Sequence, residues 1–379
     1  MKRKTLSYAT KALLATAMFS SGSLFAIQEA QACAVPVAAA ITAGIDSSYY
    51  MKSDGTVYSW GANAYGQLGN TTFTESSAPV GPVLTDVMAF DSGGVNVSAV
   101  RHDGTAWFWG IEPATNAKVN VPKQLSIENV KDLTIHSSAG ALLKQDGTVW
   151  TFGMNSFGQL GVSGAPNTTT PIQVTSLTDV KGIEAGDGHI VALKNDGTVW
   201  SWGKNDLGQL GIGGRINQKV PVQVPSLSGV VQVSAIEFFS MALKSDGTVW
   251  AWGENSYGQL GDETQVTKDV PTQVKNLTNV KMIAAGRYNG MALKEDGTVW
   301  AWGYNGFGQL GIGTTGGWKL APIQVQGLTD VIAIEAGYHH NLAIKKDGTV
   351  WAWGYNNHGQ VGQDPVNTRY ALPTQVIIP

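Results

Sequence analysis

Seven carboxylates stand at the same place in a recurring segment, and they are the first residues of this chain that suggest chemistry. Each begins an Asp-Gly pair within a segment close to Lys-X-Asp-Gly-Thr-Val-Trp-X-Trp-Gly. The aspartates are Asp54, Asp103, Asp146, Asp196, Asp246, Asp296 and Asp347. Two neighbouring carboxyl groups can act as general acid and base, but these are spread one per copy, 43 to 51 residues apart. Because Asp-Gly readily adopts the positive φ of a tight hairpin, we interpret them as turn formers.

Other catalytic and metal-binding patterns give no support to an enzyme. Cys33 is the only cysteine, so a cysteine-based zinc cluster cannot form. His339 and His340 are adjacent, but no third ligand is positioned beside them in the sequence. The chain contains no Gly-X-Ser-X-Gly elbow, phosphate loop or calcium loop. We therefore predict a protein that is not an enzyme, with no catalytic residues and no cofactor or metal.

The spacing of the copies predicts the fold. A period near 50 residues is typical of propellers, solenoids and other repeat arrays. The clearest copy contains four short segments with the alternation or turn signals of antiparallel strands: 171–174, 179–186, 189–194 and 198–203. Seven four-stranded sheets bury their apolar faces when they stack around an axis. We predict an all-β, seven-bladed β-propeller that occupies residues 33–379 as a single domain.

The tryptophan pairs are expected to join neighbouring blades. In the last strand of the copy, Trp200 and Trp202 lie two residues apart and so point to the same face. A buried aromatic side chain removes about 150–250 Å² from water. The ends of the chain suggest how the ring closes, because the first copy lacks an upstream Pro-X-Gln-Val segment and a spare one stands at 373–376. We expect this C-terminal strand to complete the first blade.

The first 32 residues resemble a secretory signal peptide. A basic start is followed by an apolar run over 12–27 and by the small-residue pattern Ala30-Gln31-Ala32. This segment predicts export to the periplasm or the extracellular medium of a bacterium. Cys33 would be the first mature residue, and attachment of a lipid there is an alternative. The run is too short for a membrane anchor, so no membrane span is expected.

The charge of the remaining chain argues against nucleic acid as a partner. Residues 33–379 contain 21 basic and 27 acidic side chains, which gives a net charge of −6. No basic stripe or tail appears, whereas proteins that bind nucleic acids need one. We expect a monomer that does not bind nucleic acid and does not attach to a membrane through a cluster of basic residues.

The repeated segments together resemble the regulator of chromosome condensation repeat. After the tryptophans comes Asn205-Asp206-Leu207-Gly208-Gln209-Leu210-Gly211, and Gly-Gln-Leu-Gly or Gly-Gln-Val-Gly recurs in most copies. The resemblance covers the whole of 33–379 and implies a seven-bladed propeller. The founding member is a nuclear exchange factor for a small GTPase that binds chromatin, a role that the predicted export and the charge do not fit. Secreted bacterial members include a propeller-type β-lactamase inhibitor, whose binding face consists of aromatic-rich turns before the Ala-Leu-Lys strand. That inhibitor has shorter repeats without much of the Gly-Gln-Leu-Gly segment.

Differences between the copies indicate where a partner would bind. The turn before the Ala-Leu-Lys strand varies from copy to copy, and its last three versions are 237–239, 287–289 and 338–340. They are rich in aromatic, arginine and histidine residues, which are enriched at interface hot spots. Packing at the rim of the propeller is the alternative role for these residues, and for His189 and His340 it is a structural hydrogen bond to a neighbouring strand. The predicted partner-binding residues are Phe238, Phe239, Arg287, Tyr288, Tyr338, His339, Trp318 and Tyr49.

Trp318 lies outside the tryptophan pairs, in a glycine-rich loop, where it would either contact a partner or fold over its own blade. The second copy never reaches Gly-Gln-Leu-Gly, which we attribute to sequence drift. We predict a secreted or periplasmic scaffold that binds or inhibits a partner protein. A carbohydrate-binding or adhesive surface is one alternative, and an enzyme at the mouth of the central channel is another.

Overall fold

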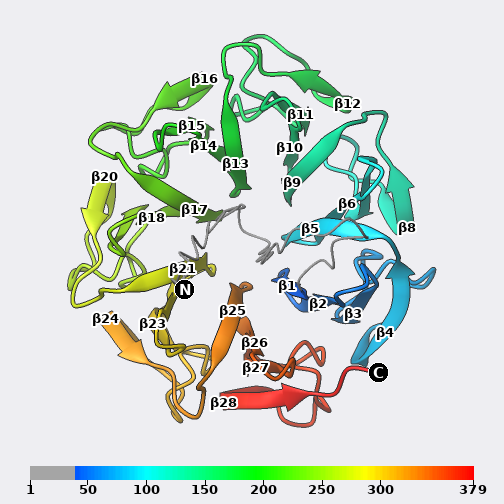
Figure 1. Cartoon of the computed structure of the whole chain (residues 1–379), viewed down its shortest axis with the longest axis vertical. Helices are drawn as coiled ribbons and strands as arrows, with labels where there is room; N and C mark the ends of the chain where they lie inside the picture. Colours follow the sequence, from blue (N-terminus) through cyan, green and yellow to red (C-terminus); the bar gives the residue numbers. More distant parts are fainter. Residues whose placement is uncertain (1–38) are drawn as a thin grey trace, which may run out of the picture.

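The computed structural model describes residues 39–379, and every regular element in that range is a β-strand. The strands form seven four-stranded antiparallel sheets that stand as blades around a central axis (Figure 1). The predicted all-β, seven-bladed propeller is confirmed. The predicted signal peptide, 1–32, and Cys33 lie outside the described residues. Within 39–379 no helix is long and apolar enough to cross a membrane.

Each blade runs in chain order from an innermost strand beside the axis to an outermost strand at the rim (Figure 1). Blades 1 to 3 consist of β1 (Ala40–Ala43), β2 (Ser47–Met51), β3 (Val57–Gly61) and β4 (Ser76–Leu84); β5 (Val87–Gly93), β6 (Asn96–Arg101), β7 (Ala106–Ile111) and β8 (Lys118–Gln124); β9 (Val130–His136), β10 (Ala139–Lys144), β11 (Val149–Gly153) and β12 (Thr168–Gln173). Blades 4 and 5 consist of β13 (Val180–Ala185), β14 (His189–Lys194), β15 (Val199–Gly203) and β16 (Gln218–Gln223); β17 (Val230–Ile236), β18 (Phe239–Lys244), β19 (Val249–Gly253) and β20 (Lys268–Gln273). Blades 6 and 7 consist of β21 (Val280–Ala285), β22 (Asn289–Lys294), β23 (Val299–Tyr304) and β24 (Trp318–Gln324); β25 (Val331–Ala336), β26 (His340–Lys345), β27 (Val350–Tyr355) and β28 (Arg369–Val376).

The C-terminal strand completes the last blade, so the predicted completion of the first blade is wrong. β28 pairs with β27, with Gln375 opposite Trp351. Wherever the Pro-X-Gln-Val segment occurs, it belongs to the rim strand of a blade. Its backbone pairs with the strand that precedes it in the chain and carries the aromatic pair. In blade 3, for example, the Val174 N–H donates to the Val149 carbonyl at 2.9 Å. The period of the repeat was predicted correctly, but its origin was placed one strand too early.

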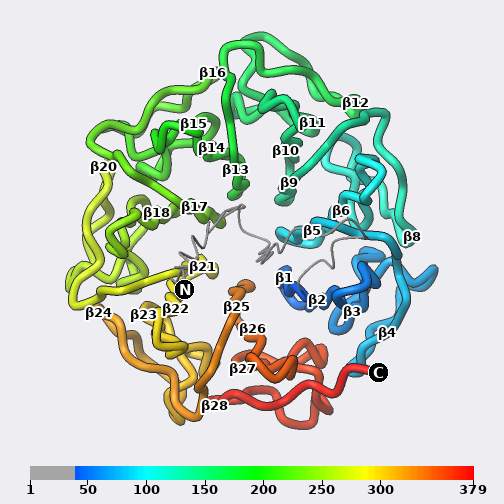
Figure 2. The backbone as a smooth tube through the Cα atoms, viewed as in Figure 1, coloured from blue at the N-terminus to red at the C-terminus, as the bar shows by residue number. Residues whose placement is uncertain are grey.

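The ring closes by packing between complete blades 1 and 7. The Trp60 indole donates to the Gln360 carbonyl at 3.0 Å, across the interface between the two blades. The C-terminal end lies beside β4 at the rim (Figure 2). There the Lys52 ammonium donates to the carbonyl of Pro379 at 2.6 Å. The first and last blades are therefore held together without a covalent link.

The Asp-Gly pairs form hairpin turns, as the sequence indicates. Oδ1 of Asp196 accepts hydrogen bonds from the Thr198 backbone N–H at 2.9 Å and from the Thr198 hydroxyl at 2.7 Å. These bonds hold the pKa of Asp196 below its ordinary value. Gly197 has φ +80°, a conformation that glycine adopts without strain. The carboxylates stabilise turns and are exposed separately, one on each blade.

The second tryptophan of each pair inserts into the preceding blade. Trp202 is fully buried, and its indole donates to the Gln159 carbonyl of blade 3 at 3.0 Å. The same bond is made by Trp60, Trp109, Trp252, Trp302 and Trp353. Blade 3 has Phe152 at this position, and the blade it faces is the second, which lacks the Gly-Gln-Leu-Gly loop. Blade 2 thus lacks the glutamine carbonyl that would accept this bond, and blade 3 lacks the indole that would donate it. The two losses belong together, because a buried indole N–H needs a hydrogen-bond acceptor.

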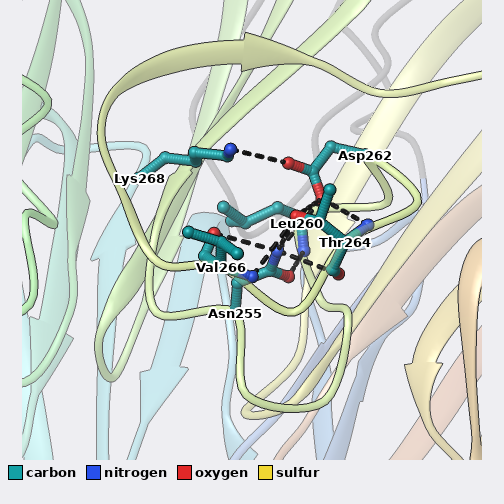
Figure 3. A network of polar contacts seen from close by, with 6 residues as sticks. All are labelled: Asn255, Leu260, Asp262, Thr264, Val266 and Lys268. Carbon is teal, nitrogen blue, oxygen red and sulfur yellow. Dashed lines mark hydrogen bonds and ion pairs between the residues drawn. The ribbon is translucent and has the colours of Figure 1, made fainter.

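The Gly-Gln-Leu-Gly loops between the third and fourth strands are fixed by a buried asparagine (Figure 3). In blade 5, Nδ2 of Asn255 donates to the Asp262 carboxylate at 3.0 Å and to the carbonyls of Thr264 and Val266 at 3.1 and 3.2 Å. Its Oδ1 accepts the Leu260 N–H at 3.0 Å. One side chain therefore ties together both limbs of the loop and holds its exposed residues in place.

Candidate partner-binding surface

Two sets of loops meet at one end of the propeller. The hairpin turns between the first and second strands and the Gly-Gln-Leu-Gly loops between the third and fourth strands lie at the same end of each blade, because the strands alternate in direction. The Asp-Gly turns lie at the opposite end. The predicted partner-binding residues all belong to the first end or to the adjoining start of β24.

Three of the predicted residues are buried and cannot contact a partner in this conformation. Tyr49 and Phe239 are fully buried, and Tyr338 is 4% exposed. The Tyr49 hydroxyl donates to the Gln67 carbonyl at 3.0 Å. Phe239 follows Phe238 directly, so in the strand it faces the opposite side and joins the core. These three side chains pack inside the propeller and do not form part of the surface described below.

The other five predicted residues are accessible. Phe238, Arg287, Tyr288 and His339 are half-buried, and Trp318 is 47% exposed. Phe238 lies apart from the others, beneath the Lys204 ammonium, which is 4.8 Å from its ring centroid.

Neighbouring aromatic rings connect blades 5, 6 and 7 into one patch. It consists of Tyr257, Tyr288, Tyr304, Phe307, Trp318, His339 and Tyr355, which we call the aromatic surface. The ring centroid of Tyr257 is 4.9 Å from that of Tyr288 and 4.9 Å from that of Tyr304. The Phe307 ring is 4.7 Å from both His339 and Tyr355. The Tyr304 and Phe307 rings are 6.0 Å apart and connect the group around Tyr257 to the group around His339 and Tyr355.

Four members of the aromatic surface were not predicted from the sequence. Tyr257 and Phe307 each precede a Gly-Gln-Leu-Gly segment, and Tyr304 and Tyr355 each follow a Trp-Gly pair. Both positions belong to the repeated segment, which was treated as structural. The sequence does differ between copies at one of these positions. The residue after Trp-Gly is tyrosine in blades 6 and 7 but lysine or glutamate in blades 4 and 5.

Arginine side chains lie over rings of this region. The guanidinium carbon of Arg287 is 4.9 Å from the centroid of Tyr288 and 5.1 Å from that of Tyr338. Arg369 lies 5.3 Å from the centroid of Phe307. Contacts of this kind are worth about 0.5–2 kcal/mol each.

Burial controls the ionisation of the groups around Arg287. Burial raises the pKa of Glu237 to about 7, helped by the charge of Asp187 and opposed by Arg287. Burial lowers the pKa of His339 to about 4, and the charge of Arg287 lowers it further. His339 is therefore neutral at pH 7 and acts as an aromatic ring of the surface.

His189 and His340 have the structural role that the sequence left open. Both are fully buried. Nε2 of His189 lies 3.0 Å from the Ser240 hydroxyl of the next blade, and Nε2 of His340 lies 2.8 Å from the Ser48 hydroxyl. The two histidines therefore join blade 4 to blade 5 and blade 7 to blade 1.

Carboxyl groups also occur beside the central axis. Asp91 and Glu335 line one cavity there together with His136. Burial raises the pKa of Asp91 to about 7, and its Oδ2 accepts the Ile135 N–H of the next blade at 3.1 Å. Thr134 one blade further on makes the same kind of bond, to the Ala185 N–H at 3.0 Å. Asp91 thus occupies a position whose polar side chain links adjacent inner strands.

No group of three or more histidine, cysteine or acidic side chains within 39–379 is arranged to hold a metal ion. The aromatic surface consists of rings in contact with one another and with the guanidinium groups of Arg287 and Arg369.

Known proteins share both the repeats and the fold. Residues 111–378 match the model of the RCC1-like domain, and 54–99 and 38–67 match that of the Regulator of chromosome condensation (RCC1) repeat. The chain is 34% identical over 172 residues, 40% of its length, to the probable E3 ubiquitin-protein ligase HERC6 of Homo sapiens. It is 44% identical over 55 residues, 14% of its length, to protein pim1 of Schizosaccharomyces pombe. The matches span 16% and 10% of those two proteins.

Solved structures agree with the fold. The propeller superposes on Prp20p of Saccharomyces cerevisiae with a TM-score of 0.77 and 22% identity, over 85% of this chain and 86% of that one. It superposes on human WBSCR16 with a TM-score of 0.77 and 22% identity, over 86% and 94%. Since the RCC1-like domain model alone matches more than half of the sequence, this chain belongs to the regulator of chromosome condensation repeat family.

Proposed function

We propose that this protein is a non-enzymatic scaffold that acts in the periplasm or outside the cell and binds a partner protein through the aromatic surface. The observation that carries the proposal is the unbroken set of ring contacts from Tyr257 to Tyr355 across three blades. The signal-like segment 1–32 supports the place of action.

The physical properties of the aromatic surface favour protein binding. Tyrosine, tryptophan and arginine dominate interface hot spots because they bury large areas and lose little conformational freedom. Here the rings already contact one another, and the loop that carries Tyr257 is fixed by Asn255. A preorganised surface reduces the entropy cost of association.

Proteins of the same fold support a binding role. Prp20p is described with binding properties to Gsp1p and histones, and a second structure shows the same protein, yeast RCC1 (Prp20), bound to Kap60. Those partners belong to that protein, which is 22% and 19% identical to this chain in the two comparisons. What they support for this chain is the use of the propeller as a platform for another protein.

Binding of a carbohydrate is a second candidate function, and Trp318 favours it. This side chain is 47% exposed, and its ring lies 6.3 Å from that of Tyr257. An exposed indole beside a tyrosine provides an apolar face for a sugar ring.

Capture of partners from culture fluid and periplasmic extract, followed by mass spectrometry, tests the proposal. The variant Phe307→Ala is expected to lose the captured protein. Phe157→Ala is the matched control, since Phe157 is half-buried and precedes Gly-Gln-Leu-Gly in blade 3, outside the aromatic surface. Equal capture by the wild type and both variants would contradict the proposal. Binding on a glycan array that is lost in Trp318→Ala, with no protein captured, would favour the carbohydrate.

A further inference from the structure

Arg287 presents a buried donor that has no acceptor. It lies in the turn between β21 and β22, with its guanidinium between the rings of Tyr288 and Tyr338. Its Nε is buried and has no hydrogen-bond partner among residues 39–379. A buried donor left unpaired costs about 1–3 kcal/mol, more when it is charged. The two terminal nitrogens of the guanidinium are not among the buried unpaired atoms, so an acceptor from outside can reach Arg287 at that end.

Arg101 shows that stacking on a ring does not itself prevent pairing. Its guanidinium carbon lies 5.3 Å from the Trp107 ring centroid, and its Nε donates to the Thr85 carbonyl at 3.0 Å. Both arginines therefore stack on aromatic rings, but only Arg101 has its Nε satisfied within the chain. The two residues form a matched pair for experiments.

The nearest acidic side chains leave Arg287 without an ion pair. The charge of Arg287 lowers the pKa of Glu237 and of Glu254. Within 39–379, however, no carboxyl oxygen lies within 4 Å of a guanidinium nitrogen of Arg287. Burial raises the pKa of both carboxyl groups, that of Glu237 to about 7. Glu237 is therefore only partly ionised near neutral pH, and neither carboxyl group forms an ion pair with Arg287 within 39–379.

A second arginine on the aromatic surface is also unpaired. Arg369 is exposed, lies over Phe307 and forms no ion pair within 39–379. Lys204 and Lys268, which lie on blades 4 and 5, are each paired with an aspartate. Two cations without an ion pair in the described part of the chain, Arg287 and Arg369, therefore lie against the rings of blades 6 and 7.

We propose that Arg287 receives a carboxylate of the partner protein, from an aspartate or glutamate flanked by apolar residues that lie on the aromatic surface. A guanidinium binds a carboxylate through two parallel hydrogen bonds, and the Tyr288 and Tyr338 rings pack against the guanidinium of Arg287. Arg369 adds a second attraction for an acidic segment. This inference rests on the proposed function and specifies the chemistry of the partner.

A library of random 12-residue peptides displayed on phage, selected on the purified protein, tests the inference. We expect selected peptides to contain aspartate or glutamate next to an aromatic or aliphatic residue. Their affinity, measured by fluorescence anisotropy, is expected to fall at least tenfold for Arg287→Gln, less for Arg287→Lys, and not at all for Arg101→Gln. Replacing the peptide carboxylate by its amide is expected to cost at least tenfold on the wild type but little on Arg287→Gln.

The outcomes separate this inference from the proposed function. Peptides that require Phe307 but contain no acidic residue, or that bind Arg287→Gln as well as the wild type, overturn the carboxylate inference alone. If no selected peptide depends on Phe307, the proposed binding surface fails as well. Unchanged melting temperatures of the arginine variants ensure that a loss of affinity does not come from unfolding.

Discussion

At the scale of single residues, carboxyl groups in this protein have two opposite environments. Asp196 and its six counterparts are exposed, and threonine hydrogen bonds keep their pKa values low. Asp91 beside the channel is buried, and its pKa is raised to about 7. The sequence motif revealed only the first group, because a repeated aspartate is visible as a pattern and an isolated one in an inner strand is not.

Asp91 makes stability depend on pH. Its folded-state pKa of about 7 exceeds the ordinary value of 3.8, so its contribution is complete below pH 4 and is lost as pH rises through 7. Between pH 6.5 and 8.5 this loss amounts to about 1 kcal/mol. The buried histidines, whose pKa values are lowered, are already neutral in this window. Denaturant unfolding of Asp91→Asn should show a smaller decrease over the same range.

Glu184 and Glu335 share the sign of this effect, since burial and the charge of Asp91 raise both pKa values. The Asp91→Asn variant is therefore expected to retain some decrease in stability over this pH range. An identical decrease in the wild type and Asp91→Asn would show that water reaches Asp91 and keeps its pKa ordinary.

The exposed residues of the hairpin turns allow a direct test of binding. The double variant Phe238→Ala and Tyr288→Ala should keep the melting temperature within a few degrees, because both rings are half-buried and lie at the loop end. Partner capture should be lost, mainly through Tyr288. Phe239→Ala is the contrasting change, since deleting a fully buried phenylalanine costs about 3–5 kcal/mol. Unfolding of the double variant would assign those rings to the core.

At the scale of elements, the loop determines where its aromatic residue lies. Asn255 and Asn205 hold equivalent loops in blades 5 and 4, and each bonds both limbs of its loop. The loop of blade 5 presents Tyr257 to the aromatic surface, whereas that of blade 4 carries Leu207. The same framework therefore presents a tyrosine to the aromatic surface in one blade and a leucine at the same position in another.

Removing either asparagine separates stability from binding. Asn255→Ala and Asn205→Ala should each lower the free energy of unfolding by about 2–4 kcal/mol, because several buried partners lose their bonds. Only Asn255→Ala should also weaken partner binding, by releasing Tyr257. Chemical denaturation and affinity measurements on both variants check this, and an equal loss of affinity would mean that the effect is global.

The sequence predicted which loops form the surface better than it predicted which side chains are exposed. Tyr49, Phe239 and Tyr338 were selected for being aromatic in variable turns, yet all three are buried. Tyr49 and Phe239 lie in β2 and β18 and face the core, and Tyr338 lies in the turn before β26 and stacks on His136. Tyr257 and Phe307 were passed over because their position is part of the repeat. Exposure depends on strand alternation at the end of each turn, and a shift of one residue reverses the side.

At the scale of the whole molecule, one type of contact joins the blades. Six interfaces contain an indole that donates to a glutamine carbonyl, including the one between blades 7 and 1. The sequence predicted this packing from the tryptophan pairs. It did not predict the starting strand of each blade, since a repeating pattern has a period but no origin.

The closing interface should be as strong as an internal one. Trp60→Phe and Trp252→Phe each remove an indole hydrogen bond, at 3.0 and 2.9 Å, to a glutamine carbonyl that also accepts a serine hydroxyl, from Ser48 and Ser240 respectively. Each is expected to cost about 0.5–1.5 kcal/mol in equilibrium unfolding. A much smaller cost for Trp60→Phe would indicate that the ring opens between blades 1 and 7 before it unfolds.

Because every blade is built from consecutive strands, the break in the chain between β28 and β1 is equivalent to any of the six connections that run from a rim strand to the next inner strand. In blade 3 that connection is only 174–179. A chain in which β28 is linked to β1 by a segment of this length, and opened at 174–179 instead, would contain the same seven sheets in a different order. The propeller can thus be circularly permuted without changing a single blade, and the new termini would always lie at the end of the Asp-Gly turns, opposite the aromatic surface.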